Sequence, residues 1–495
     1  MALSAYEKLH SRQRDVSLLG STAEVLGWDQ ETCLPDAGVA WRAEQLAFLQ
    51  GQKHRLATAP EVADWLSEAE AGPTSANPVE ATNLRWWRRH YERAVRLPVD
   101  LVEEFTRATA LAQSVWAHAR KDSDFSLFQP HLEKLVELTR QRADAWGWEV
   151  CRYDALLEGY EPGARSAELS RLFSELAPQI SALVTPAREH SKRWPAETLA
   201  GEYPIAAQQA FNREIAEAVG FDFTAGRIDT ATHPFCTALG PQDVRLTTRY
   251  NKKDFTTSLF GVLHEAGHGL YDQGLDGMEW GQPAGSSLSL GIHESQSRLW
   301  ENHVGGSVVF WEKWHARAAH YFPHLALLTP AALAGAVARV EPSFIRVEAD
   351  QVTYDLHIIL RFEIEQALVE GNLAVRDVPG YWNKRFETLL GLTVPDDRRG
   401  CLQDVHWSFG LFGYFPTYTL GNLNAAQLMA GARADVPHLE VALAAGHYAP
   451  LLGWLRENVH SLGQRLMPQE LMLHATGETT QIRYHLEHLR SKFAA

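Results

Sequence analysis

Cysteine is scarce in this chain of 495 residues. The four cysteines (Cys33, Cys151, Cys236 and Cys401) lie far apart and form no CxxC pair. Small secreted domains held by disulfides have dense, closely spaced cysteines, so this spacing argues against that class. We expect four reduced, buried thiols in a cytoplasmic protein.

Long apolar runs and basic clusters are also missing. No apolar run approaches the ~18 residues that a membrane span needs, and the opening MALSAYEKLHSRQRD lacks the apolar centre of a signal peptide. Lys and Arg number 46 against 61 Asp and Glu, a formal net charge of −15. The basic residues are scattered, apart from Arg85, Arg88 and Arg89 on one solvated helix face. We therefore expect neither a membrane protein nor a nucleic-acid-binding one.

Helical periodicity runs through most of the chain. Its 45% apolar and 22% charged residues are typical of a globular protein. Helix is predicted up to about residue 195 and again from 330 to the end, with Pro98 just before one helical run, Pro130 opening the next and a loop at 72–78. No repeat or linker interrupts this pattern. We expect one mostly α-helical domain over residues 1–495, with two helical lobes around a cleft.

One segment departs from helical periodicity. Residues 225–250 are rich in Thr, and Gly240-Pro241 separates two runs, which predicts a small hairpin or sheet. Asp243, Arg245 and Thr247 would share one face of the second run. Its edge would offer an extended peptide a strand to pair with. The alternative is a hairpin with a purely structural role.

The strongest chemical signal is HEAGH, residues 264–268. On a helix, His264 and His268 are one turn apart on one face, so both imidazoles reach one metal ion. Glu265 lies about 100° round the helix from His264, beside the metal and suited to act as a general base. This is the HExxH pattern of zinc hydrolases. The pattern is short, and alone it leaves open a helix with two polar core histidines.

A third ligand favours the metal site. Zinc needs three protein ligands and one open position for water if it is to catalyse. Glu294 follows His268 by 26 residues, at the start of a second helical run that the loop 281–285 allows to fold back. Two His and one Glu form the ligand set of a catalytic zinc site. We predict that His264, His268 and Glu294 bind the metal.

Residues 341–368 predict another helix, with Ser343 as its N-cap. Its polar line would contain Arg346, Asp350, Thr353 and His357. Arg346 would either pair with Asp350 or face the cleft and hold a carboxylate with both arms of its guanidinium.

Residues 400–422 are rich in Gly and aromatic residues, which predicts a loop or a broken helix. His406, Tyr414 and Tyr418 are candidate donors to an oxyanion formed on a substrate carbonyl. Each of these aromatic residues has packing as its alternative role.

Together these motifs resemble the carboxypeptidase Taq family of zinc metallocarboxypeptidases, in order and over nearly the whole chain. The matching motifs are HPF (233–235), DVRLT (243–247), HEAGH (264–268), HESQ (293–296), IRVEAD (345–350) and GCLQDVHW (400–407), with WDQET (28–32) and YDALLEGYEPG (153–163) as N-terminal landmarks. No position that the motifs fix departs from the pattern.

The resemblance implies an almost all-helical, zincin-like fold with a deep central cleft, similar to neurolysin and angiotensin-converting enzyme, and one small sheet beside the active site. It implies a homodimer and one divalent metal, zinc or sometimes cobalt, bound by His264, His268 and Glu294. It makes Glu265 the general base. The resemblance further assigns the remaining roles: Arg346 to the free C-terminal carboxylate of a peptide, His406 with Tyr418 or Tyr414 to the tetrahedral intermediate, and Asp243, Arg245 and Thr247 to the shape of the edge strand and cleft.

The resulting expectation is a peptide hydrolase that releases single C-terminal residues with broad specificity. One alternative is an oligopeptidase or dipeptidyl peptidase on the same scaffold, since the distance from the carboxylate anchor to the metal decides the cleavage position. The other is a metal-bound helical scaffold without catalysis. Degenerate copies of that kind lose the base or a ligand, and all four groups are present here.

Overall fold

Most of the described chain is α-helical, as the sequence pattern predicts. The computed structural model describes residues 3–72 and 77–493, so most of the loop predicted at 72–78 lies outside the described residues. Within those residues, no helix is both long and apolar enough to cross a membrane. The helices up to the sheet are α1 (Ala5–Thr32), α2 (Val39–Ala57), α3 (Pro60–Ala71), α4 (Pro78–Val95), α5 (Val99–Asp122), α6 (Phe125–Trp146), α7 (Arg152–Leu157), α8 (Ser166–Ser191) and α9 (Ile205–Val219).

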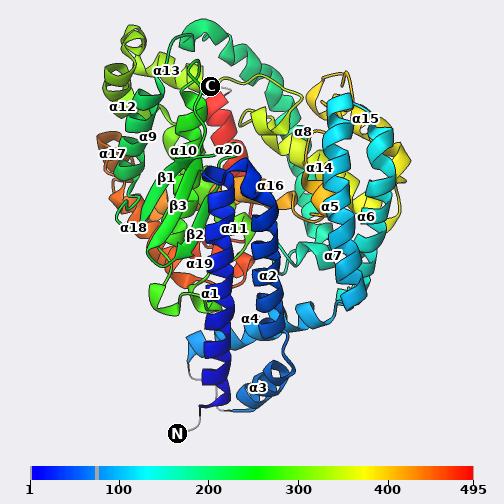
Figure 1. Cartoon of the computed structure of the whole chain (residues 1–495). Helices are drawn as coiled ribbons and strands as arrows, with labels where there is room; N and C mark the ends of the chain where they lie inside the picture. Colours follow the sequence, from blue (N-terminus) through cyan, green and yellow to red (C-terminus); the bar gives the residue numbers. More distant parts are fainter. Residues whose placement is uncertain (1–2, 73–76, 494–495) are drawn as a thin grey trace.

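The helices after the sheet contain most of the predicted site. They are α10 (Thr256–Asp272), α11 (Leu290–Arg298), α12 (Val308–Tyr321), α13 (Pro330–Val337), α14 (Tyr354–Glu370), α15 (Val378–Leu390), α16 (Pro416–Asp435), α17 (Leu439–Ala445), α18 (Ala449–Asn458), α19 (Pro468–Thr476) and α20 (Ile482–Phe493). A π-helical turn, Leu299–Gly305, continues α11 directly. The fold is therefore mostly α, as predicted (Figure 1).

Polar side chains decide where several helices begin. Pro98 is the N-cap of α5, as expected, but the prediction that Pro130 opens the next helix is wrong. Helix α6 begins five residues earlier, because the Asp124 carboxylate accepts the Ser126 backbone N–H at 2.9 Å and caps it. Pro130 then lies inside the helix.

The predicted helix over 341–368 is also wrong in its first half, because α14 begins only at Tyr354. Ser343 Oγ accepts the Ile345 N–H at 3.1 Å, and Asp350 Oδ1 accepts the N–H groups of Val352 and Thr353 at 2.9 Å. These local bonds form turns that compete with a helix. Only a short 3₁₀ turn, Arg346–Glu348, precedes the true helix.

The small sheet has three strands: β1 (Gly226–Thr230), β2 (Cys236–Gly240) and β3 (Asp243–Thr248). The order is β1-β3-β2, with β1 parallel and β2 antiparallel to β3. The prediction of a small sheet within residues 225–250 is confirmed. The prediction that the strand containing Asp243, Arg245 and Thr247 lies at the edge of the sheet is wrong, because this strand, β3, is the central one. The two edge strands are β1 and β2, and α1 lies along β2, where Ser21 Oγ donates to the Leu239 carbonyl (Figure 1).

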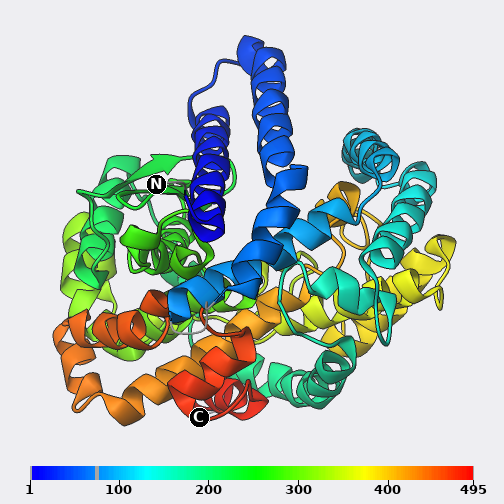
Figure 2. The same ribbon diagram turned by 90° about the horizontal axis from the view of Figure 1, so that it is seen from below.

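Two large apolar cores flank the predicted site. One gathers residues of α5 to α8, α14, α15 and α20, and the other residues of α9 to α13 and α17 to α19. Helix α16 contributes to both, through Leu420 and Leu423 to the first and Ala425 and Leu428 to the second. Helices α1 and α2 form a pair that projects from this body (Figure 2). The helix of the HEAGH motif therefore belongs to one core, and the loop containing His406 belongs to the other.

The four cysteines are all unpaired. Cys401 is buried and Cys151 and Cys236 are half-buried, but Cys33 is exposed, so the prediction of burial is wrong for Cys33. Cys33 is the C-cap residue of α1.

Helices α10 and α11 approach each other more closely than side chains normally permit. A Cβ atom on Gly267 would lie 2.5 Å from the Ser297 Cα and 2.6 Å from the Gln296 carbonyl oxygen. Both atoms belong to the backbone, so only a shift of a whole helix would relieve the clash. The contact requires glycine in the HEAGH motif.

We expect Gly267→Ala to lower the free energy of unfolding by about 1–3 kcal/mol, because it overpacks the contact between α10 and α11. Urea denaturation measures this. Gly453→Ala is the matched control: it is another helical glycine, a Cβ there meets nothing within 4 Å, and the higher helix propensity of Ala makes the change neutral or stabilising. Equal effects of the two substitutions would contradict the close contact.

Candidate metal centre

Three side chains from two helices converge on one point. His264 and His268 lie one turn apart on α10, and Glu294 lies on α11. Their ligand atoms all lie within 4.8 Å of one another. The Glu294 Oε2 atom is 3.6 Å from His264 Nε2 and 3.5 Å from His268 Nε2. The structure therefore brings together the three residues predicted to bind the metal.

Each histidine is oriented by a partner on its other ring nitrogen. His264 Nδ1 is 2.9 Å from Glu301 Oε2, and His268 Nδ1 is 3.0 Å from the His293 carbonyl oxygen. Both partners accept, so each Nδ1 is the donor and each Nε2 is left facing Glu294. Metal-binding histidines are typically held in this way, with the second nitrogen donating to a carboxylate or a carbonyl.

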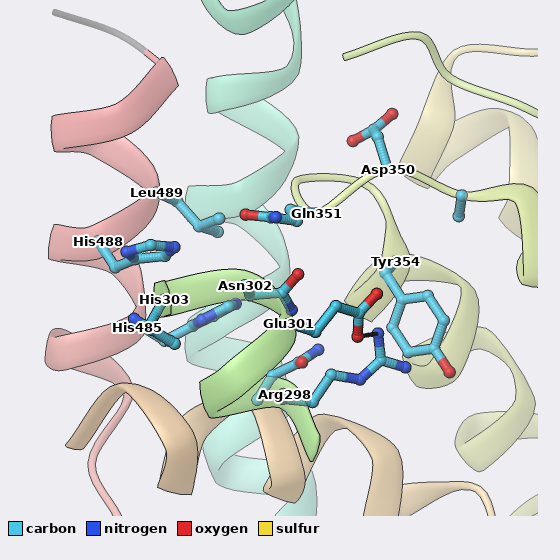
Figure 3. A pocket seen from close by; sticks show the side chains of 12 residues that line it. Arg298, Glu301, Asn302, His303, Asp350, Gln351, Tyr354, His485, His488 and Leu489 are labelled. Atoms are coloured by element: carbon cyan, nitrogen blue, oxygen red, sulfur yellow. Dashed lines mark hydrogen bonds and ion pairs between the residues drawn. The ribbon is translucent and has the colours of Figure 1, made fainter. Parts of the chain in front are cut away.

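Glu294 is held by Arg298, four residues further along α11. Arg298 Nε donates to Glu294 Oε1 at 2.7 Å, and its Nη1 donates to Glu301 Oε2 at 3.2 Å. The Arg298 guanidinium also lies 4.5 Å from the Tyr354 ring centroid, and Figure 3 shows it between Glu301 and Tyr354. Burial opposes ionisation of Glu294, but Arg298 and His264 hold its pKa well below the ordinary value. Glu294 is therefore a carboxylate, the form that binds a metal.

The donor set and its charge fit a divalent cation. Glu265 lies beside the triad and is 6% exposed; burial raises its pKa to about 7, with His264 lowering it and Glu294 raising it. Three carboxyl groups, those of Glu265, Glu294 and Glu301, thus meet in one buried region. A cation offsets their mutual repulsion, and two His with one Glu is a set that catalytic zinc uses.

Arg346 lies in the short 3₁₀ turn before α14 and is 6% exposed. Its Nε and Nη2 donate to Asp404 Oδ1 at 3.0 and 2.8 Å, and its Nη1 donates to the Tyr354 hydroxyl at 3.1 Å. The predicted alternative, a pair with Asp350, is wrong, because the helix that would have aligned the two does not form. Asp404 also binds Arg361 Nε at 2.6 Å. Arg346 is therefore rigidly oriented before any ligand arrives.

His406, Tyr414 and Tyr418 cluster beside Arg346. His406 Nε2 is 3.4 Å from the Tyr418 hydroxyl, and the ring centroids of Tyr414 and Tyr418 are 5.4 Å apart. Burial lowers the pKa of His406 to about 4, against the opposing effect of Asp404, so the imidazole is neutral. The Tyr418 ring also lies 5.1 Å from the Arg346 guanidinium. The three candidate donors and the candidate anchor form one group.

Helix α16 connects this group to the metal ligands. Tyr418 lies in its first turn, and Gly421 follows one turn later. A Cβ on Gly421 would lie 2.4 Å from Glu294 Cγ. Helix α16 therefore touches Glu294 directly and positions Tyr418 beside it.

Asp243, Arg245 and Thr247 make their side-chain contacts outside the metal-ligand triad. Arg245 donates twice to Asp243, at 2.8 Å, and lies 4.4 Å from the Trp28 ring centroid on α1. Thr247 Oγ1 is buried and accepts the Phe235 N–H at 2.8 Å. These side chains bond within the sheet and to α1, so their contribution to the cleft is the shape of the sheet rather than contact with the triad.

Several important residues were not anticipated from the sequence. Arg298 and Glu301 follow Glu294 by four and seven residues, a helical spacing that could have identified them. Asp404 lies in the quoted motif GCLQDVHW, two residues before His406, but a sequence gives no indication that Arg346 and Arg361 share it. Tyr354 was not identified because the helix was predicted to begin at 341 rather than at Tyr354.

Comparisons with known proteins agree over the whole chain. A sequence model described as carboxypeptidase Taq (M32) metallopeptidase matches residues 8–493. Thermostable carboxypeptidase 1 of Thermus thermophilus is 43% identical over 506 residues, covering 99% of both chains. Carboxypeptidase 1 of Bacillus subtilis is 36% identical, covering 100% of this chain and 99% of the relative. The crystal structure of an M32 carboxypeptidase from Deinococcus radiodurans R1 is similar with a TM-score of 0.96 at 38% identity, over 99% of this chain and 98% of that chain.

We expect Glu301→Ala to weaken zinc binding about 10–100-fold, because it removes the acceptor that orients His264. Competition against a chromophoric chelator measures the Kd. Glu312→Ala, an exposed glutamate on α12, is the control and should leave the Kd unchanged. Zinc affinity of Glu301→Ala equal to that of the control would contradict the orienting role.

Proposed function

From the premise that this chain belongs to the carboxypeptidase Taq (M32) family of metallopeptidases, we propose that it releases single C-terminal residues from peptides at the centre formed by His264, His268 and Glu294. The family makes the chain a peptide hydrolase of the metal-dependent carboxypeptidase class. One observation supports the single-residue reading most. A preoriented arginine, Arg346, lies in the same group as His406 and Tyr418, and α16 connects that group to Glu294.

The metal ligands are His264, His268 and Glu294, and zinc is the proposed metal, with cobalt as a substitute. A bound zinc ion supplies Lewis-acid polarisation of the scissile carbonyl and acidifies water. Glu265 is adjacent in sequence to His264, is buried, and is close enough to His264 and Glu294 for their charges to shift its pKa. It accepts the proton of the attacking water and then delivers that proton to the departing amine. The reaction needs no covalent intermediate.

Arg346 fixes which peptide bond reaches Glu265. Asp404 accepts from its Nε and Nη2 atoms and the Tyr354 hydroxyl accepts from Nη1, so these partners hold the guanidinium in one orientation. The remaining N–H groups bind the terminal carboxylate of the substrate, in the geometry that guanidinium groups favour. The residue between Arg346 and the scissile carbonyl is then the one that leaves. A free C-terminus is therefore required.

His406 and the two tyrosines stabilise charge on the substrate carbonyl oxygen. The imidazole of His406 is neutral, so one ring nitrogen donates a proton to a hydrogen bond. Tyr418 lies 3.4 Å from that ring, and Tyr414 packs on Tyr418. Donors held in place before the reaction stabilise an oxyanion at little reorganisation cost. Tyr418 is the proposed donor, with Tyr414 as its alternative.

The broad side-chain specificity and the homodimer stay predictions from the resemblance, and the cytoplasmic location stays a prediction from the cysteine pattern. An oligopeptidase or dipeptidyl peptidase would share the metal and Glu265 but would place its carboxylate anchor elsewhere. A scaffold without catalysis would bind metal and leave peptides intact.

We expect Glu265→Gln to keep its metal and to lose roughly 10²–10⁴-fold in turnover, because the amide cannot accept the proton of water. Metal content by atomic absorption and steady-state kinetics measure the two quantities separately. Near-normal turnover with full metal content would exclude Glu265 as the base.

Mass spectrometry of an octapeptide tests the anchor and the reaction together. The enzyme should shorten the free acid one C-terminal residue at a time and leave the C-terminally amidated peptide intact. A chelator should abolish the ladder, and zinc or cobalt should restore it. Arg346→Lys keeps a positive charge beside Asp404 but loses the planar guanidinium that binds a carboxylate with two hydrogen bonds. The KM for the free-acid peptide should therefore rise, and the preference of the enzyme for the free acid over the amidated peptide should become smaller.

Other cleavage patterns have defined meanings. Internal or two-residue cuts would be consistent with the roles of the metal and Glu265, but would show that the group that binds the substrate carboxylate is not Arg346. An unchanged preference for the free acid in Arg346→Lys, together with Arg346→Ala, would also remove Arg346 from the site. Intact peptides in the presence of bound metal would favour the scaffold.

A further inference from the structure

The motif YDALLEGYEPG has no role in the reaction described above, yet it contacts both halves of the site. Residues 153–161, which we name the brace segment, comprise most of α7 and the turn that follows it. We propose that the brace segment holds α11 against the loop containing His406 and Tyr414, with Glu161 and Glu365 as positioning residues. This inference rests on the proposed function, since it assigns α11 to the metal and the loop to catalysis.

The first contact is with the N-terminus of α11. The first N–H groups of a helix have no partner within the helix. Here Leu290 N donates to the Tyr160 carbonyl at 3.0 Å, and Gly291 N donates to Glu161 Oε2 at 3.0 Å. Ile292 N donates to Ser289 Oγ at 3.2 Å. The brace segment therefore provides two of the three acceptors that fix the start of this helix, one turn before Glu294.

The side chain of Glu161 is buried against the first turn of α11. It is 1% exposed, and a Cβ on Gly291 would lie 2.6 Å from its Oε2 atom. Burial raises its pKa to about 7, while the Ser289 and Gly291 groups lower it. A buried carboxyl group is costly unless its hydrogen bonds compensate. An apolar side chain would fill this space at a lower cost in free energy, so we infer that the carboxyl group is present for the hydrogen bond that it accepts.

The second contact runs through Glu365 of α14. Its Oε2 atom accepts the Tyr153 hydroxyl at 2.7 Å and the Gly413 N–H at 2.9 Å, and its Oε1 atom accepts Trp407 Nε1 at 2.9 Å. Trp407 follows His406, and Gly413 precedes Tyr414. One buried carboxyl group thus secures both ends of the loop between the candidate oxyanion donors.

The loop also lies directly against the brace segment. Gly413 has a positive φ of 89°. A Cβ there would lie 3.0 Å from Leu157 N. Only glycine satisfies both the positive φ and the close approach.

Tyr160 joins the two contacts. Its carbonyl oxygen accepts the first N–H of α11, and its ring packs against Tyr414 with centroids 5.3 Å apart. A displacement of Tyr160 therefore moves the start of the metal-ligand helix and the aromatic group together. The brace segment sets the distance between Glu294 and the candidate oxyanion donors.

The two contacts predict separable effects. Loss of the Glu161 acceptor loosens α11, so it should weaken metal binding. Loss of the Glu365 acceptor frees the loop, so it should lower kcat while metal affinity stays unchanged. A residue that only stabilises the fold would lower Tm and affect neither quantity selectively.

The first test measures zinc Kd by chelator competition, together with Tm. Glu161→Ala should raise the Kd about 10–100-fold, the effect typical of residues that orient metal ligands. Glu161→Gln should return it to within about threefold of wild type, because its amide oxygen still accepts the Gly291 N–H. Asp124→Ala is the matched control, since it also removes a carboxylate from a helix N-terminus, and it should lower Tm without changing the Kd.

The second test measures kcat, KM and zinc Kd for Glu365→Gln and Tyr153→Phe. All three groups bonded to Glu365 are donors, so the amide nitrogen of Gln must oppose one of them, and kcat should fall roughly 10–100-fold. Tyr153→Phe removes one donor only and should have a smaller effect in the same direction. Zinc Kd should stay unchanged in both variants.

These outcomes separate the brace from the proposed function. Zinc Kd does not depend on which peptide bond is cut, so a failed carboxypeptidase assay leaves the first test intact. An unchanged Kd in Glu161→Ala, or a raised Kd that Glu161→Gln does not restore, would overturn the role of Glu161. If Glu161→Ala does not fold, Glu365→Gln and Tyr153→Phe decide the matter. A normal kcat in both of these variants would overturn the proposed role of the brace segment.

Discussion

The contact between α10 and α11 at Gly267 is the constraint on which the metal centre depends. The two helices approach until the Ser297 backbone occupies the space of a side chain at position 267. This approach brings the His268 ring within reach of both the His293 carbonyl and Glu294. Gly421 repeats the arrangement on the other side, where α16 lies against the Glu294 side chain. Two glycines therefore let three helices meet around one carboxylate.

Buried charge is managed by pairing in both halves of the site. On the metal side, Arg298 binds Glu294 and Glu301, so these carboxylates stay ionised despite burial. On the side of Arg346, Asp404 binds both Arg346 and Arg361 and so pairs with two buried guanidinium groups. Breaking such a pair leaves a charge without a partner, so each network resists rearrangement. Both halves are rigid before a substrate or a metal binds.

The two apolar cores explain why the halves need a connection. The HEAGH helix packs in one core and the loop with His406 packs with the other, so their relative position depends on the elements that span both. Helix α16 is one such element. The brace segment is the second, through Tyr160, Glu161 and the Tyr153–Glu365 hydrogen bond. The relative position of the two halves depends on these few bridging contacts.

The sequence alone determined the helical class, the small sheet, and the convergence of His264, His268 and Glu294, because helical spacing and ligand chemistry are local properties. It could not determine what depends on tertiary contacts. The turns at Ser343 and Asp350 prevented the predicted helix, Asp124 placed the start of α6 before Pro130, and strand order made β3 central rather than an edge. The partner of Arg346 was likewise decided in three dimensions, since Asp404 lies 58 residues away. Periodicity reports which face a residue occupies, and only the packed structure decides which distant group it meets.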